Sequence, residues 1–309
     1  MNQAALLVTT ATAALGGLLL WGTLDSLPSS SAALATAPAL TPEYGEELLR
    51  NTSVHLGAGQ TDPARRYAGN NLDCSSCHLE SGRKPGNLSL LQSAAKYPTF
   101  SGRDGKVGDL ADRINGCMQR SMAGRLMPKD SLEMQAMVLY VEQLGRQYAA
   151  MGESSRRVVE PAAFAEPARA ADLDHGGAVY RQHCQVCHGV QGEGLKETGN
   201  LADGYLFPPL WGPDSYNIGA GMARVLTAAR FIKARMPLGN PVLTDDEAFD
   251  VAAYMNAQPR PAMADLDRDY PDRTLKPVDS PYPPYADAFP VEQHRLGPYA
   301  PIRAIYQKP

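Results

Sequence analysis

The sequence has little of what several common protein classes need. Aromatic residues make up only 7% of the 309 positions, there are five cysteines, and no run of clustered Lys and Arg is present. Because phosphate backbones are bound by clustered positive charge, and the formal net charge is −4, nucleic acid is excluded as an expected partner. No stretch alternates apolar and polar residues in the way that predicts a β-strand. We therefore expect an all-α fold.

Charged side chains are absent from the first 24 residues. The apolar segment from Ala4 to Trp21 and the later Ala35-Thr36-Ala37 are typical of a secretory signal with a cleavage site, although no Lys or Arg precedes the apolar segment. The apolar run approaches membrane-spanning length, so an uncleaved anchor is the alternative. We expect residues 1–37 to be a signal peptide or N-terminal signal anchor, with residues 4–27 as a membrane tether, and the rest of the chain to be periplasmic.

After residue 37 the chain repeats one pattern twice. Each half contains a C-x-x-C-H motif, then a stretch rich in Gly and Pro, then an amphipathic helix. The first half should open with a helix at Thr41-Pro42, and its closing helix should follow Asp130-x-x-Glu133, a variant capping box. The second closing helix should follow the capping box that begins at Thr244 and run to about Asn256. We predict two small domains and a connecting linker, with the boundaries 38–150, 172–258 and 151–171.

Beyond Gln258 the chain is dense in Pro, Tyr and Asp, as in Ser280-Pro281-Tyr282-Pro283-Pro284-Tyr285. Proline lacks a backbone N–H and clashes with the preceding helical turn, so this composition disfavours both helix and central strand. We expect residues 259–309 to form an irregular tail that wraps over one domain, with disorder as the alternative.

Four of the five cysteines lie in two C-x-x-C-H motifs, Cys74-Ser75-Ser76-Cys77-His78 and Cys184-Gln185-Val186-Cys187-His188. In an exported chain cysteines usually form disulfides, but this spacing is that of c-type haem attachment. Two thiols add to the haem vinyl groups, and the imidazole that follows reaches the iron. A Cys₄ zinc site would leave both histidines unexplained. The sequence therefore predicts two covalently attached haem c groups in two cytochrome c-like domains, with His78 and His188 as iron ligands.

The sixth iron ligands are predicted from the sulfur side chains that remain. Met236-Pro237 lies shortly before the last helix of the second half, where a small cytochrome c carries its methionine ligand. In the first half Met127-Pro128 occupies the equivalent position, and Cys117 is the one cysteine without a haem to attach. Both stay candidates for the first iron, with apolar packing as the alternative role of either side chain.

The surroundings of Cys117 favour a functional thiol. If residues 113–121 are helical, Arg113 and Ser121 lie four residues before and after it on the same face. A guanidinium and a hydroxyl beside a thiol favour the thiolate and form a binding site for a small oxyanion. Arg103 and Arg125 are further sources of positive charge.

The run from Ile114 to Met122, the two haem motifs and Met236-Pro237-Leu238-Gly239 together resemble the dihaem thiosulfate dehydrogenases, over roughly residues 41 to 258. The resemblance implies that the first haem has His/Cys ligation and is the active site, and that the second haem passes electrons onward. It also implies Cys117 as axial ligand and Arg103, Arg113 and Ser121 as substrate-binding residues. Some family members carry an exchangeable lysine ligand just before the second-haem methionine. Here that position is Arg235, a poor ligand, and Lys233 is displaced from it.

The implied reaction joins two thiosulfates into tetrathionate, in either direction. An external acceptor such as a small cytochrome c or a high-potential iron–sulfur protein, soluble or membrane-bound, would take the electrons. Two alternatives stay open. One is a dihaem electron carrier without its own substrate, with Met127 on the first iron. The other is the haem subunit of a multiprotein sulfur-oxidising complex.

Overall fold

The computed structural model describes residues 38–157, 163–198 and 204–306. The predicted signal segment and membrane tether, residues 1–37, lie outside these ranges. Within them, no helix combines the length and apolar character that crossing a bilayer requires.

Helices dominate both halves of the chain, as expected. The first half contains α1 (Pro42–Arg50), α2 (Thr52–His55), α3 (Leu110–Arg120) and α4 (Leu132–Ala150). The second contains α6 (Leu173–His183), α7 (Gln185–His188), α8 (Val225–Arg235) and α9 (Asp245–Ala257), and α5 (Glu153–Arg157) lies between the halves. Short 3₁₀ turns occur at Pro63–Arg65, Cys74–Ser76, Glu80–Gly82, Ala94–Lys96, Gly221–Ala223, Leu266–Arg268 and Arg273–Leu275.

Two small antiparallel hairpins were not expected from the sequence. β1 (Thr99–Ser101) pairs with β2 (Lys106–Gly108), with Phe100 opposite Val107, and β3 (Leu195–Lys196) pairs with β4 (Tyr205–Phe207). Strands of two or three residues are too short to show an alternating pattern, which explains why they were not predicted from the sequence.

Helix caps decide where the main helices begin. Thr41 accepts a hydrogen bond from the Tyr44 amide at the start of α1, and Thr244 and Glu247 form the reciprocal capping box of α9, as predicted. The expected cap at Asp130 is wrong by one residue. The hydroxyl of Ser131 accepts from the Met134 amide and caps α4 instead.

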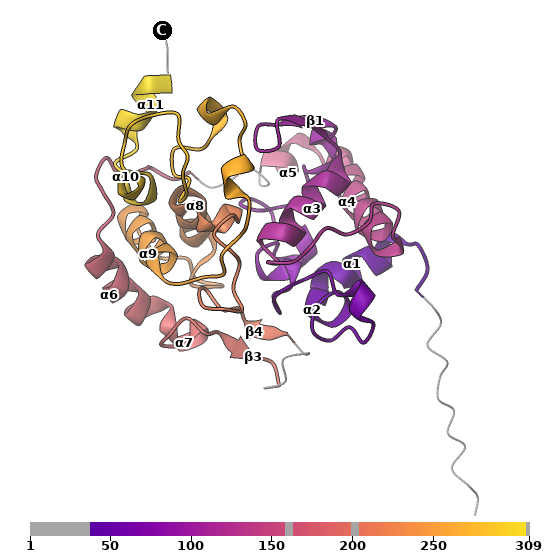
Figure 1. Ribbon diagram of the computed structural model, residues 1–309. Helices are drawn as coiled ribbons and strands as arrows, with labels where there is room; N and C mark the ends of the chain where they lie inside the picture. The colour runs from indigo at the N-terminus through magenta and orange to yellow at the C-terminus, as the bar shows by residue number, and fades with distance from the viewer. Residues whose placement is uncertain (1–37, 158–162, 199–203, 307–309) are drawn as a thin grey trace, which may run out of the picture. The chain divides into compact units, whose positions relative to one another are not determined.

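The first and last helices of each half cross at a glycine. A Cβ on Gly45 in α1 would lie 2.0 Å from the Ala136 carbonyl oxygen of α4, and a Cβ on Gly176 in α6 would lie 2.2 Å from the Asp250 carbonyl oxygen of α9. In each case a tyrosine four residues further on, Tyr140 or Tyr254, is also within contact range. Figure 1 shows α1 beside α4 and α6 beside α9. The repeated sequence pattern thus produces the same helix crossing twice.

Replacing either crossing glycine should destabilise the fold. Gly176→Ala places a methyl group inside van der Waals distance of a backbone oxygen, so the helices must separate. We expect the free energy of unfolding to fall by about 1–3 kcal/mol, the usual effect of overpacking. Thermal unfolding of the holoprotein measures this. Gly152→Ala is the control, since nothing lies within 4 Å of a Cβ there, and equal melting temperatures for the two variants would refute the crossing.

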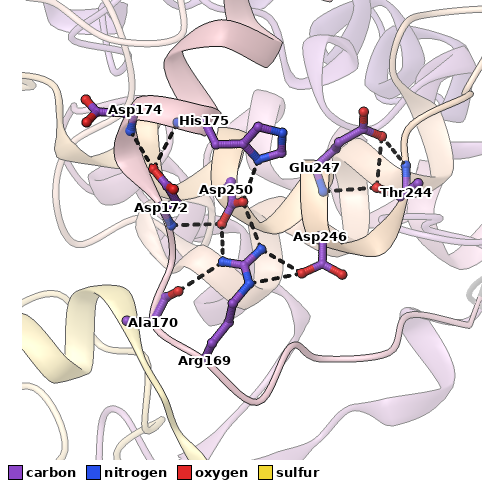
Figure 2. Close-up of polar contacts among 9 residues, drawn as sticks. All are labelled: Arg169, Ala170, Asp172, Asp174, His175, Thr244, Asp246, Glu247 and Asp250. Carbon is purple, nitrogen blue, oxygen red and sulfur yellow. Dashed lines mark hydrogen bonds and ion pairs between the residues drawn. The ribbon is translucent and has the colours of Figure 1, made fainter.

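Hydrogen bonds and ion pairs join the end of the predicted linker to α9 (Figure 2). Asp250 is buried on α9, and its two carboxylate oxygens accept hydrogen bonds from Arg169 at 2.7 and 2.9 Å. The Asp172 amide and the His175 ring also contact this carboxylate. Burial alone would raise the pKa of Asp250, but Arg169 and His175 outweigh it and lower the pKa. This ionic contact joins the segment around Arg169 to α9.

The tail beyond Gln258 is more ordered than its composition suggested. The described part contains α10 (Val291–Leu296) and α11 (Ala300–Tyr306), contrary to the expectation of no helix. The prolines stand where a helix needs no N–H, with Pro290 as the N-cap of α10 and Pro301 in the first turn of α11. Tyr299 and Ile302 are fully buried in the hydrophobic cluster of the second half. The tail is therefore part of the packed structure.

Candidate active site

Each C-x-x-C-H motif occupies a tight helical turn that presents its histidine in the same way. Cys74 begins a 3₁₀ turn, and Cys184 ends α6 just before α7. The Nδ1 atom of His78 lies 2.7 Å from the Leu88 carbonyl oxygen, and that of His188 lies 2.8 Å from the Pro208 carbonyl oxygen. Because a carbonyl can only accept, Nδ1 carries the proton in both rings, and the Nε2 lone pair is left for a metal.

The first motif lies in a cavity of about 560 Å³. This volume falls in the usual range for cofactor and ligand sites. Seven of the residues predicted for the first half line it, and they come from the haem motif, from α3 and its C-cap, and from the loop after β1: Cys74, Cys77, His78, Arg103, Arg113, Cys117 and Ser121. The structure therefore brings together residues that are spread over almost fifty positions.

The donor set fits a covalently bound haem. Two partly buried thiols and a histidine whose Nδ1 contacts a carbonyl share one cavity with a further cysteine, as thioether attachment and two axial ligands require. Among the described residues, no three His, Cys, Asp or Glu side chains converge as a site for a bare metal ion. The two cysteine pairs thus do not form the Cys₄ zinc site considered from the sequence.

Cys117 differs in its electrostatics from the attachment cysteines. Burial raises the pKa of Cys77 to about 11 and that of Cys74 to about 12. Burial would also raise the pKa of Cys117, but Arg113 and His78 outweigh it and lower the pKa to about 6. The Arg113 Nη1 atom lies 3.1 Å from the Cys117 sulfur. A thiolate is the form that binds iron and acts as a nucleophile.

Helix α3 fixes these side chains relative to one another. Asp109 and Asp112 form a capping box that begins the helix, so Arg113 and Cys117 are one turn apart on one face. Ser121 follows as the C-cap and still has right-handed helical backbone angles. The predicted helix through Gly116 is therefore confirmed, and it ends just before the hydroxyl that was expected to lie on the same face.

Arg103 approaches the cavity from the loop between β1 and β2. Its Nη1 atom donates to the Gly219 carbonyl at 2.9 Å and to the Asp269 carboxylate at 3.0 Å. Burial alone would lower its pKa, but the neighbouring Tyr270, Tyr282 and Asp269 outweigh burial and raise it. Arg103 therefore carries its charge at the cavity wall, held by residues of the second half and the tail.

Two other candidates from the sequence lie elsewhere. Arg125, expected to add charge, donates instead to the carbonyls of Ala64 and Arg66 and stacks 4.4 Å from the centre of the Tyr67 ring. Arg125 is close to Cys117 in the sequence, but it does not line the described cavity. Within the described residues the cavity wall includes Cys117 and does not include Met127, which is 1% exposed in the first hydrophobic cluster.

The predicted sulfur ligand of the second iron is Met236. Met236 follows α8 as its C-cap and packs against the hydrophobic cluster of the second half. Its neighbour Arg235 donates to the Pro85 carbonyl of the first half. Lys233 donates to the Leu243 carbonyl at 2.6 Å. Both cationic side chains are therefore hydrogen-bonded to backbone carbonyls.

Several residues that line this cavity were not identified from the sequence. Arg120 lies on α3 next to Ser121, and its buried Nε atom has no hydrogen-bond partner in the described structure. Tyr270 and Leu275 come from the tail. Arg120 stood inside the run that carried the family resemblance, but no sequence signal connects the tail to the cavity.

Comparisons with known proteins agree with this arrangement. The cytochrome c domain described as SoxA/TsdA matches residues 64–149, and the domain described as Cytochrome C oxidase, cbb3-type, subunit III matches residues 171–255. The chain thus contains two cytochrome c domains, which bind haem c.

Full-length relatives extend the similarity over most of the chain. Thiosulfate dehydrogenase of Stutzerimonas stutzeri (strain A1501) is 38% identical over 222 residues, which cover 71% of this chain and 69% of that protein. Thiosulfate dehydrogenase of Allochromatium vinosum (strain ATCC 17899) is 37% identical over 242 residues, covering 76% of this chain and 86% of that protein.

A solved structure is similar in fold as well as in sequence. Thiosulfate dehydrogenase (TsdBA) from Marichromatium purpuratum, in its "as isolated" form, matches with a TM-score of 0.63 and 35% identity. The match covers 80% of this chain, which spans half of that longer chain. By its two cytochrome c domains and by these relatives, the chain belongs to the thiosulfate dehydrogenase family of c-type cytochrome oxidoreductases.

Proposed function

We propose that this protein carries two haem c groups and oxidises two thiosulfates to tetrathionate, passing the electrons to an external acceptor. The observation that carries this proposal is the Cys117 sulfur, which shares a cavity with His78 and lies 3.1 Å from the Arg113 guanidinium. A thiolate opposite the histidine would complete His/Cys ligation of the first iron. The names and coverage of the relatives support the choice of substrate.

The residues of the cavity suit two dianions that must react with each other. Thiosulfate carries two negative charges, so bringing two molecules together requires compensating positive charge. Arg103 and Arg113 both line the cavity and supply it, and Ser121 adds a hydroxyl donor. Fixed donors in a site shielded from water stabilise charge more strongly than solvent does. Their role is to align the two terminal sulfur atoms.

The overall reaction releases two electrons: two S₂O₃²⁻ become one S₄O₆²⁻. When bound, each haem is a one-electron acceptor, so the pair matches the oxidation in number. We propose that Cys117 takes part covalently. Its thiolate forms a bond to the sulfane sulfur of the first thiosulfate, and two electrons are released. The product is a Cys–S–S–SO₃⁻ adduct. The second thiosulfate attacks that sulfane sulfur, tetrathionate leaves, and the thiolate is regenerated.

The second domain is proposed to pass electrons onward. His188 and Met236 would ligate its iron, and His/Met ligation favours a higher potential than His/thiolate ligation. The proposed acceptor is a small cytochrome c or a high-potential iron–sulfur protein. We also propose that residues 1–37 direct the chain to the periplasm, where both kinds of acceptor are available.

Replacing Met236 should change the second haem and leave the first unchanged. In Met236→His the thioether is exchanged for a second imidazole, so we expect the midpoint potential of this haem to fall on the order of 0.1 V, within the roughly 0.8 V range set by axial ligands. Spectroelectrochemical titration of the holoprotein measures both potentials. Met255→Leu is the matched control, since Met255 is a buried methionine of α9. This substitution should leave both midpoint potentials unchanged. An unchanged titration of Met236→His would exclude Met236 as a ligand.

The proposed activity is tested by thiosulfate-dependent reduction of ferricyanide by the pure holoprotein. We expect turnover without any added protein, and one tetrathionate formed for every two ferricyanides reduced. Activity that appears only on adding a partner would instead favour the haem subunit of a larger complex. No activity under either condition would favour a simple electron carrier.

A further inference from the structure

We propose that Asp269 of the C-terminal tail is a positioning residue of the active site, which holds Arg103 and Arg120 in the orientation that binds thiosulfate. This inference rests on the proposed function, because it concerns the same cavity. It assigns a role to a part of the chain that lies beyond both cytochrome c domains.

The Asp269 carboxylate bridges two guanidinium groups at the cavity wall. One oxygen accepts from Arg103 Nη1 at 3.0 Å, and the other accepts from Arg120 Nη2 at 2.7 Å. The Tyr282 hydroxyl donates to the first oxygen at 2.7 Å. The Asp269 side chain is only 9% exposed, and the two arginine side chains are 20% and 10% exposed. A charged network this well shielded from water is strong and directional.

The tail backbone around Asp269 is itself fixed. The Tyr270 amide donates to the Arg103 carbonyl at 2.7 Å, and the Arg103 guanidinium lies 5.2 Å from the centre of the Tyr270 ring. Arg273 donates to the carbonyls of Asp269 and Tyr270. The tail therefore contacts both the backbone and the side chain of Arg103. This geometry differs from a loose ion pair between two mobile surface groups.

The contacts leave donors of both arginines available. The three hydrogen bonds that Arg103 donates from its guanidinium to described residues all use Nη1, toward Gly219, Asp269 and Tyr282. Arg120 uses Nη2 toward the carboxylate, and its buried Nε atom lacks an acceptor among the described residues. Both side chains line the cavity. An oxyanion in the cavity would supply the acceptor that a buried donor needs.

Whether thiosulfate binding weakens or strengthens when the Asp269 carboxylate is removed distinguishes a positioning role from a purely electrostatic one. Without the carboxylate, the site gains positive charge, which by itself would strengthen the binding of a dianion. If Asp269 instead holds the two guanidinium groups in place, its removal lets them reorient away from each other, and binding weakens. The two roles therefore predict opposite changes in the dissociation constant.

The test compares Asp269→Asn with Asp287→Asn in the full-length holoprotein. Asp287 is the matched control, since it is a carboxylate of the same tail that pairs with His294 and Tyr306, and none of these three lines the cavity. Calorimetric titration of the fully reduced protein with sodium thiosulfate gives the dissociation constant without turnover. Steady-state ferricyanide reduction gives KM and kcat separately, and thermal unfolding monitors stability.

For Asp269→Asn we expect the dissociation constant and KM to rise about tenfold, the effect of losing one charge-assisted hydrogen bond, with kcat changing less than about threefold. Asp287→Asn should lower stability without changing either constant. A dissociation constant that falls or stays the same in Asp269→Asn, while the wild type binds and turns over thiosulfate, would overturn the positioning role alone. A wild type that neither binds nor oxidises thiosulfate would overturn the proposed function as well.

Discussion

Cys117→Ala should abolish thiosulfate oxidation while the protein keeps both haems. The variant loses the sulfur that lies 3.1 Å from the Arg113 guanidinium and shares the cavity with His78, and with it both the proposed iron ligand and the proposed nucleophile. Removing a residue that acts in both roles should lower kcat by at least about a thousandfold. Ferricyanide reduction measures the rate, and the ratio of haem absorbance to protein confirms that cofactor attachment is intact.

Met127→Leu is the matched control for this variant, because Met127 was the other sulfur candidate for the first iron. It is buried in the hydrophobic cluster and absent from the described cavity wall. A change from Met to Leu nearly conserves volume, so it should reduce stability by less than about 1.5 kcal/mol and leave turnover intact. If Met127→Leu lost activity and Cys117→Ala kept it, the assignment of the two sulfurs would be reversed.

Arg113→Gln should have the second largest effect. The guanidinium is 3.1 Å from the Cys117 sulfur and lines the cavity, so its loss removes the positive charge closest to the thiolate and to the substrate. We expect kcat/KM for thiosulfate to fall by about 10²–10³, as when one donor of a catalytic anion site is removed. The kcat/KM of Arg113→Lys should lie between those of the wild type and of Arg113→Gln, because lysine keeps the positive charge but lacks the planar guanidinium.

Arg125→Gln provides the comparison for Arg113. The two arginines flank the same cysteine in sequence, but Arg125 donates to the carbonyls of Ala64 and Arg66 away from the cavity. Its replacement should leave kcat/KM within about threefold of the wild type, because surface contacts of this kind contribute little. Equal losses in the two variants would mean that general positive charge, and not the contact with the sulfur, sustains the reaction.

The sequence carried much of the local structure, because local structure depends on neighbouring residues. Thr41 and Thr244 begin helices that a capping signal identifies, and the spacing of Arg113, Cys117 and Ser121 places them on one face once α3 forms. The haem motifs are equally local, since two thiols and an imidazole must lie within one turn.

Long-range contacts could not be predicted, because they do not depend on neighbouring residues in the sequence. Asp269 and Arg120 form an ion pair although they are 149 positions apart in the sequence. Neither residue belongs to a sequence motif that predicts this contact. Arg103 and Arg125 looked equivalent as sources of charge, but the hairpin of β1 and β2 turns one toward the cavity, and the chain after α3 carries the other away. Composition also misjudged the tail, because prolines at helix starts are compatible with α10 and α11.

The central claim is that the Cys117 thiolate completes the coordination of the first haem iron. Near-infrared magnetic circular dichroism of the oxidised holoprotein tests it directly, since the energy of the low-spin charge-transfer band depends on the axial ligands. We expect two bands of equal weight, one typical of histidine with thiolate and one typical of histidine with thioether, and only the first should vanish in Cys117→Ala. Two thioether bands, or a bis-histidine band, unaffected by that substitution would contradict it.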